Sequence, residues 1–281
     1  MTFSIVGYDP KTKEHGIAVA SKFLSVGAVV PFAKAGVGAI ATQSWANLDY
    51  GVKGLELLEQ GHSPQEVFEQ IRATDENFAS RQIGIVDAKG RGFTFTGDEC
   101  FDWAGGLAGE NYAAQGNILV DHSTVENMEA TFLQTEGSLA DRLLSALLAG
   151  DAAGGDSRGK QSAALLVVKE NGSYGGYTDK YIDLRVDDHE DPVVELGRLM
   201  KLHKLYFEGT KKEDIVEVSG VLEDEIRELL YRSGHLSREY ADHDSILKAL
   251  ESYQYRENFD ERVQPKGFVD VQVVEYMRLM K

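Results

Sequence analysis

Cysteine and long apolar runs are scarce in this chain of 281 residues, which holds a single cysteine, Cys100. One cysteine cannot form a disulfide within the chain, so we expect a reducing compartment. No run approaches the roughly 18 apolar residues of a membrane span. The first residues also lack the basic segment and apolar stretch of a signal peptide. These absences predict a cytoplasmic protein with no membrane partner.

Positive charge is also in short supply. Lysine and arginine total 29 against 46 acidic residues, which gives a formal net charge of −17. Such a chain repels phosphate backbones, so we expect no nucleic-acid partner. With 42% hydrophobic residues, the chain should nevertheless fold into a globular core.

The strongest catalytic and cofactor motifs are absent: there is no P-loop, GxGxxG, HExxH or GxSxG pattern. The stretch from Asp187 to Asp191 has metal-ligand character. Side chains along an extended chain alternate in direction, however, so this stretch favours a polar turn. We expect no metal and no cofactor. Cys100 has no neighbouring base in sequence and is more typical of a small buried residue than of a nucleophile.

Apolar patterning predicts an α+β fold, with sheets stacked between helical layers. Expected strands cover 3–8, 16–21, 36–42, 82–87, 91–96, 162–168 and 181–186. The first two strands should form a hairpin, as should 82–87 with 91–96. We expect one helix to begin at a capping box at Ser63 and a second at a capping box at Ser123. A third should contain the leucines of 139–147, and a fourth should begin at Asp191-Pro192.

Composition changes near residue 207. Residues 206–281 hold only 4 of the 29 glycines, so we divide the chain into domains 1–207 and 208–281, the second small and mainly helical. A capping box at Thr210 and a break at Gly220 give a pattern similar to a helix-turn-helix. Its second helix carries Glu223, Asp224, Glu225 and Glu228, which would face phosphates and so argue against DNA binding.

The N-terminal Met-Thr sequence offers the clearest chemistry. Removal of Met1 would leave Thr2 with a free α-amine beside its own hydroxyl, and an amine that titrates near 7.7–8.0 can act as the base for that hydroxyl. Many inert proteins also begin with Met-Thr, and retention of Met1 would lock the amine in a peptide bond. The hypothesis gains weight because Thr2 leads directly into a predicted core strand.

A nucleophile of this kind needs a cation and an oxyanion hole. Lys22 and Lys34 each interrupt apolar stretches, although either could simply end a strand with its ammonium group in water. Gln43 and Asn117 each follow a strand-like stretch and could donate an amide N–H to an oxyanion, or merely cap a strand end.

Several motifs together resemble domain-of-unknown-function family 1028, which is grouped with the N-terminal nucleophile (Ntn) hydrolases. They are Thr2–Val6, Ala20–Gly27, Gly38–Gln43, Trp103–Gly105, Tyr112–Asn117, Ala153–Ser162 and Asp183–His189. The resemblance covers about 1–207 and implies a four-layer αββα sandwich of two antiparallel sheets. Residues 208–281 resemble, more weakly, a peptidoglycan-binding-like module that accompanies some members.

The resemblance also implies site roles. In proteasome-type relatives a threonine nucleophile is supported by a lysine and by an oxyanion donor at a strand end, and Thr2, Lys34 and the Gln43 region fall at similar spacings. Ser21 and Lys22 stand where such enzymes carry an acid or an arginine, and Ser21 departs from that pattern. The expected function is an amidohydrolase acting on a small molecule or peptide, and a homo-oligomer is expected. The alternative is an inactive protein of the same fold that binds a cell-wall-like or metabolite ligand.

Overall fold

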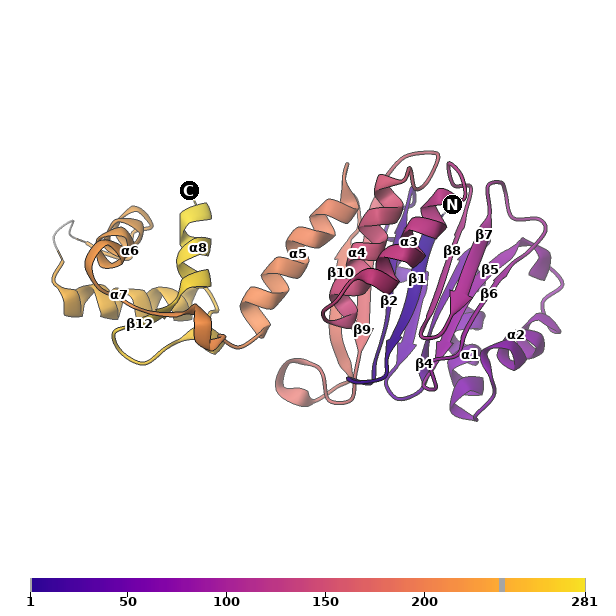
Figure 1. Cartoon of the computed structure of the whole chain (residues 1–281), viewed down its shortest axis with the longest axis horizontal. Coiled ribbons are helices and arrows are strands. Elements are labelled where there is room, and N and C mark those ends of the chain that lie inside the picture. Colours follow the sequence, from indigo (N-terminus) through magenta and orange to yellow (C-terminus); the bar gives the residue numbers. More distant parts are fainter. Residues whose placement is uncertain (1, 238–240, 281) are drawn as a thin grey trace. The chain divides into compact units, whose positions relative to one another are not determined.

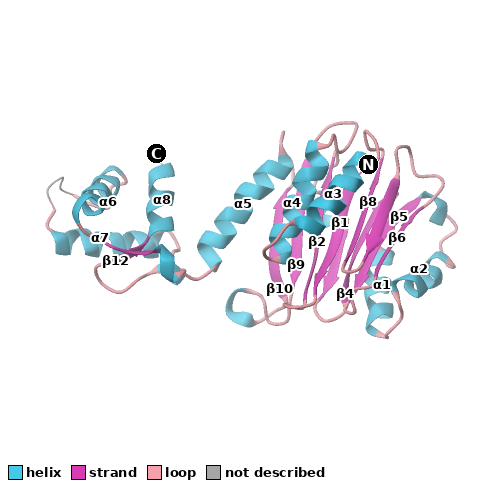
Figure 2. Ribbon diagram, viewed as in Figure 1, coloured by secondary structure: helices cyan, strands magenta, loops and turns pink. Residues whose placement is uncertain are grey.

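The computed structural model describes residues 2–237 and 241–280. These residues form a mixed α/β protein with antiparallel sheets and eight α-helices (Figures 1 and 2). They fall into two compact units that divide between Arg198 and Leu199. This division lies inside helix α5 (Pro192–Phe207), whereas the sequence placed the boundary at the end of that helix.

The larger sheet of the first unit has six strands, and neighbouring strands in it are antiparallel. In sheet order they are β10 (Lys180–Val186), β9 (Ser162–Val168), β2 (Glu14–Ser21), β1 (Thr2–Asp9), β8 (Tyr112–Asn117) and β7 (Gly105–Gly109). Strand β1 is therefore central, and all eight of its residues are buried.

The smaller sheet has four antiparallel strands, in chain order β3 (Pro31–Lys34), β4 (Gly38–Ser44), β5 (Arg81–Asp87) and β6 (Gly92–Thr96). Helices α1 (Asp49–Glu59) and α2 (Pro64–Arg72) pack on it through an apolar cluster that includes Ile40, Tyr50 and Phe68. Helices α3 (Ser123–Gln134) and α4 (Leu139–Ala152) cover the larger sheet (Figure 1).

The space between the two sheets changes character along β1. At one end, Val6 and Tyr8 join an apolar cluster with residues of β4 and β5. Toward the other end, Ser4 and Thr2 occupy the same face because side chains alternate along a strand. On the opposite face, Gly7 lies against Leu139 and Leu143 of α4 and Phe132 of α3. Thr2 therefore faces the inter-sheet space at its polar end.

Most predicted elements of the first unit are confirmed. Both hairpins form, and Ser63 and Glu66 complete the predicted capping box of α2. The capping box predicted at Ser123 is wrong: Ser123 is already helical, and its main-chain N–H donates to Asp121. The stretch around 187–191 is a polar turn before α5, in which His189 accepts from the N–H of Asp191.

The second unit contains α6 (Gly220–Arg232), α7 (His243–Arg256), α8 (Val271–Leu279) and a two-stranded antiparallel sheet of β11 (Ile215–Glu217) and β12 (Phe268–Asp270). The helix predicted from Thr210 is wrong. Its residues form a short 3-10 turn and strand β11, and Thr210 donates its hydroxyl to Asp270. Gly220 begins a helix rather than separating two, so the helix-turn-helix interpretation fails.

Candidate functional site

Thr2 is the first residue of the central strand, and the hairpin brings it beside the last residue of β2. Its Oγ1 lies 3.2 Å from Oγ of Ser21. Thr2 is 6% exposed and Ser21 is 2% exposed. The structure thus places the predicted nucleophile in a fixed, largely buried position with a second hydroxyl in contact.

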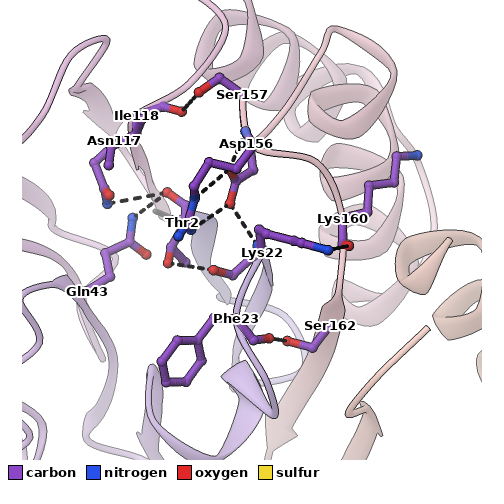
Figure 3. A network of polar contacts seen from close by, with 12 residues as sticks. Thr2, Lys22, Phe23, Gln43, Asn117, Ile118, Asp156, Ser157, Lys160 and Ser162 are labelled. Carbon is purple, nitrogen blue, oxygen red and sulfur yellow. Dashed lines mark hydrogen bonds and ion pairs between the residues drawn. The ribbon is translucent and has the colours of Figure 1, made fainter. Parts of the chain in front are cut away.

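Two amide side chains hold the main chain of Thr2. Its carbonyl oxygen accepts from Nε2 of Gln43 at 3.2 Å and from Nδ2 of Asn117 at 3.5 Å (Figure 3). Both amides also donate to Oε1 of Gln82, at 2.8 Å each. Gln43 and Asn117 therefore lie where the sequence placed them, beside Thr2. Their amide groups bond the main chain of Thr2 and the side chain of Gln82, and a role for them in an oxyanion hole stays a prediction.

The two predicted lysines are not brought to the hydroxyl of Thr2. Lys34 lies at the end of β3 opposite Gly38, and its ammonium pairs with Glu59 at 2.6 Å on the surface. Lys22 is close in the chain, but its ammonium donates to the carbonyl of Lys160 at 3.2 Å (Figure 3). Both ammonium groups therefore bond other partners, and cationic support of Thr2 by Lys22 and Lys34 stays a prediction. Lys22 instead donates its main-chain N–H to the carboxylate of Asp156.

A loop between α4 and β9 supplies two site residues that sequence reasoning did not single out. Asp156 accepts from the main-chain N–H of Lys22 at 2.7 Å and pairs with Arg158, whose Nη2 lies 3.2 Å from its Oδ2. Ser157 fixes the loop by donating to the carbonyl of Ile118 at 2.8 Å. The available signal was a charged pair within a glycine-rich stretch, where Gly154, Gly155 and Gly159 have positive φ.

A cavity of about 510 Å³ opens next to Thr2. Its volume lies in the range of small-molecule sites, roughly 300–1,000 Å³. The described residues that line it are Thr2, Phe23, Val26, Val29, Val30, Gln43, Ser44, Trp45, Ala46, Arg81, Phe101, Asn117, Ile118 and Arg158. The predicted nucleophile therefore shares this cavity with apolar side chains and two arginines.

Arg81, which lines the cavity, belongs to an ion pair. Its guanidinium pairs with Asp75, with Nε 2.9 Å from Oδ2, and the pair is largely buried. Hydrogen bonding from Arg81 lowers the pKa of the Asp75 carboxyl well below its usual range, and Asp75 in turn raises the pKa of Arg81. Arg81 also donates to the carbonyl of Trp45. Both charges are thus fixed over the physiological pH range.

Other candidate features lie outside this site. Cys100 is buried, and its thiol donates to the carbonyl of Arg81. Within residues 2–237 and 241–280, no three His, Cys, Asp or Glu side chains gather as a metal site would require. Over the same residues, no helix combines the length and apolar character needed to cross a membrane.

Comparison with known proteins places the chain in a family. Residues 2–196 match the Family of unknown function (DUF1028), and the chain belongs to it. It is similar to the crystal structure of a Silicibacter pomeroyi protein of the same family, with a TM-score of 0.66 and 29% identity. That similarity covers 79% of this chain and 88% of the other. No curated protein matches the chain.

Proposed function

We propose that the first unit is an Ntn-type αββα sandwich and that the protein is an N-terminal-threonine amidohydrolase. The two facing antiparallel sheets, with α3 and α4 on one and α1 and α2 on the other, support the fold assignment. The observation that carries the activity is the position of Thr2: its hydroxyl contacts Ser21 and its residue lines the cavity.

The proposed reaction begins after Met1 is removed. The α-amine of Thr2 takes the proton of its hydroxyl, directly or through a water, and Oγ1 attacks the carbonyl carbon of the amide. The C–N bond breaks as the ammonium returns that proton to the leaving nitrogen. Water then hydrolyses the acyl ester of Thr2. One water is consumed, and one carboxylic acid and one amine are released.

The neighbours of Thr2 have separate roles in this proposal. Ser21, at 3.2 Å, can exchange a proton with the hydroxyl of Thr2. Gln43 and Asn117 hold the carbonyl of Thr2, which restricts rotation of its main chain. A fixed nucleophile loses less entropy on reaching the transition state.

An electrophile that needs both groups of a terminal threonine gives the sharpest test. An α′,β′-epoxyketone reacts with a hydroxyl at its ketone and with a neighbouring amine at its epoxide. Intact-mass analysis of protein lacking Met1 should show an adduct at Thr2, and Thr2→Ala should show none. Thr2→Ser keeps both groups and should still react. Protein with Met1 retained has no free amine on Thr2 and should resist the reagent.

Turnover of amides should follow the same order. Thr2→Ala should lose at least 10³-fold in rate, because it removes the attacking oxygen. Lys34→Gln should be as active as the wild type, because its ammonium bonds Glu59. Undiminished hydrolysis by Thr2→Ala would refute the proposal. So would protein lacking Met1 that neither reacts with the epoxyketone nor hydrolyses any member of an amide library.

Ligand binding without catalysis is the second candidate function. It is favoured by the lysine geometry, since the ammonium groups of Lys22 and Lys34 bond elsewhere and give the Thr2 hydroxyl no support. A ligand that binds the cavity without being cleaved by protein lacking Met1 would favour it. The peptidoglycan-binding character of 208–281 and a homo-oligomeric state stay predictions.

A further inference from the structure

The two arginines that line the cavity beside Thr2 are each paired with an aspartate. Arg81 bonds both carboxylate oxygens of Asp75, through Nε at 2.9 Å and Nη2 at 3.3 Å. Arg158 bonds both oxygens of Asp156, through Nε at 3.4 Å and Nη2 at 3.2 Å. The other described lining side chains are uncharged. The two ion pairs therefore bring no net charge to the cavity, which favours neither an anion nor a cation.

The amide side chains in the wall also have partners within the protein. Nε2 of Gln43 donates to the carbonyl of Thr2 and to Oε1 of Gln82, and its Oε1 accepts from the hydroxyl of Ser4. Nδ2 of Asn117 donates to the same two acceptors as Nε2 of Gln43. The surface that the rest of the wall offers to a ligand is therefore mainly apolar.

Large apolar side chains line the cavity and leave much of their surface in contact with solvent. Three of them are aromatic: Phe23, Trp45 and Phe101 are 49%, 63% and 60% exposed. Val26 and Val30 also line the cavity and are buried. Exposed apolar surface that gathers around one cavity is typical of a ligand site, because a bound ligand removes that surface from water.

Two lining residues have a left-handed backbone, which side chains rarely adopt. Ser44 directly follows Gln43 and has a φ of 69°. Ile118 directly follows Asn117 and has a φ of 50°, which is a genuine outlier for a β-branched residue. Its main-chain N–H donates to the carbonyl of Phe101 at 3.0 Å. Backbone strain of this kind clusters at functional sites, and at Ile118 it accompanies an apolar side chain in the cavity wall.

We propose that the cavity binds an uncharged, apolar acyl group, and that the substrate is a neutral amide that carries it. The inference rests on the proposed function, because it names the substrate class of the same site. In that reaction the acyl group stays attached to Thr2 through both steps, whereas the amine leaves before water attacks. The apolar wall therefore suits the acyl part. An ionic group would lose its hydration there without an unpaired charge to replace it.

The test measures binding separately from turnover, by calorimetry with Thr2→Ala prepared without Met1. Three N-methylamides share the same amine part and differ at the end of the acyl chain. N-methyl-3-phenylpropanamide is neutral, N-methylsuccinamate ends in a carboxylate, and N-methyl-4-aminobutanamide ends in an ammonium. The phenyl compound should bind about 10-fold more tightly than either ion, because transfer of its ring from water is favourable and transfer of a charge is not.

Two substitutions in the wall, each made in the Thr2→Ala protein, test where the phenyl compound binds. Ile118→Asn replaces apolar surface by an amide, and asparagine tolerates the left-handed backbone better than isoleucine, so the fold should be kept. Phe23→Ser changes a half-exposed lining position. Each should weaken binding about fivefold through the loss of apolar contact. Leu133→Asn, at an exposed position of α3 outside the described lining, is the matched control and should bind unchanged.

The outcomes separate this inference from the proposed activity. Equal or tighter binding of either ion, no binding of the phenyl compound, or unchanged affinity in both Ile118→Asn and Phe23→Ser would overturn the inference. If the phenyl compound binds selectively but protein lacking Met1 neither cleaves it nor reacts with the epoxyketone, the apolar site stands and the amidohydrolase proposal fails. If the epoxyketone labels Thr2 and the preference is absent, the activity stands and the inference fails.

Discussion

His15 should make the first unit sensitive to mild acid. It lies in β2 opposite Tyr8 of β1, with no exposed surface, and the two ring centroids are 4.5 Å apart. Burial lowers the pKa of His15 from 6.5 to about 4, and it outweighs the opposing attraction of Asp87. The folded protein therefore holds a neutral imidazole in its interior.

The sign follows from proton uptake. Between pH 6.5 and 4 the unfolded chain binds a proton at His15 that the folded chain excludes, so stability falls as pH falls through this window. The contribution of the neutral imidazole to the free energy of unfolding is fully present above pH 6.5 and is lost by pH 4. At about 1.4 kcal/mol per tenfold change in proton affinity, the whole effect is about 3 kcal/mol. Most of it, about 2 kcal/mol, falls between pH 7 and 5.

Urea unfolding followed by tryptophan fluorescence measures this effect, because Trp45 and Trp103 both belong to the first unit. The loss of unfolding free energy from pH 7 to pH 5 should be about 2 kcal/mol smaller in His15→Phe than in the wild type. His62→Gln, at a half-exposed position, is the matched control and should behave as the wild type. Equal pH dependence in His15→Phe and the wild type would show that the buried imidazole is not the cause.

Three further substitutions test how the interiors are held. Gln82→Met removes the acceptor shared by the Gln43 and Asn117 amides and should lower the unfolding free energy by about 2–4 kcal/mol in the fluorescence assay; a loss under 1 kcal/mol would contradict the network. Gly84→Ala should cost about 1–3 kcal/mol by the same assay, because its Cβ would lie 2.1 Å from an oxygen of Gln115, and a neutral result would mean that Gln115 can move away. Arg262→Met leaves the buried Asp270 without its cationic partner and should cost about 3–5 kcal/mol, measured by hydrogen exchange in α7; unchanged exchange would refute this.

Local signals predicted the elements whose formation depends on neighbouring residues. The β1–β2 hairpin follows from two apolar runs around a turn, and α2 from the capping box at Ser63. Helix α1 was missed because its N-cap, Leu48, makes no side-chain capping bond. Strand β7 (Gly105–Gly109) was missed because three of its five residues are glycine, which propensity assigns to turns.

The sequence predicts the neighbours of Thr2 only where local strand pairing determines them. The hairpin brings Thr2 next to Ser21, and this follows from sequence once the turn is placed. The position of Lys34 depends on strand register, since the β3–β4 pairing puts it opposite Gly38, at the far end of β4 from Gln43. A run of apolar residues does not specify the register of a strand pair. It therefore does not show which end of the pair lies beside another strand.

The role of the Asp156 loop depends on contacts between residues far apart in the chain. Asp156 meets the main-chain N–H of Lys22 across 134 positions, and Ser157 meets the carbonyl of Ile118. Nothing local to the loop distinguishes its charges from an exposed turn. The motif resemblance drew attention to the stretch but assigned it no role, and only the folded chain turns Arg158 into a lining residue of the cavity.

The polar cluster between the sheets is itself an argument for a site at Thr2. Ser4, Gln43, Gln82 and Asn117 are at most 1% exposed, and an apolar set of the same volume would pack without the need to satisfy every donor. Their hydrogen bonds converge on one another and on the carbonyl of Thr2. A buried network of this kind gives little net stability but fixes a unique geometry. What it fixes here is the main chain of the residue whose hydroxyl lies beside Ser21, and a merely structural strand end would not need that restraint.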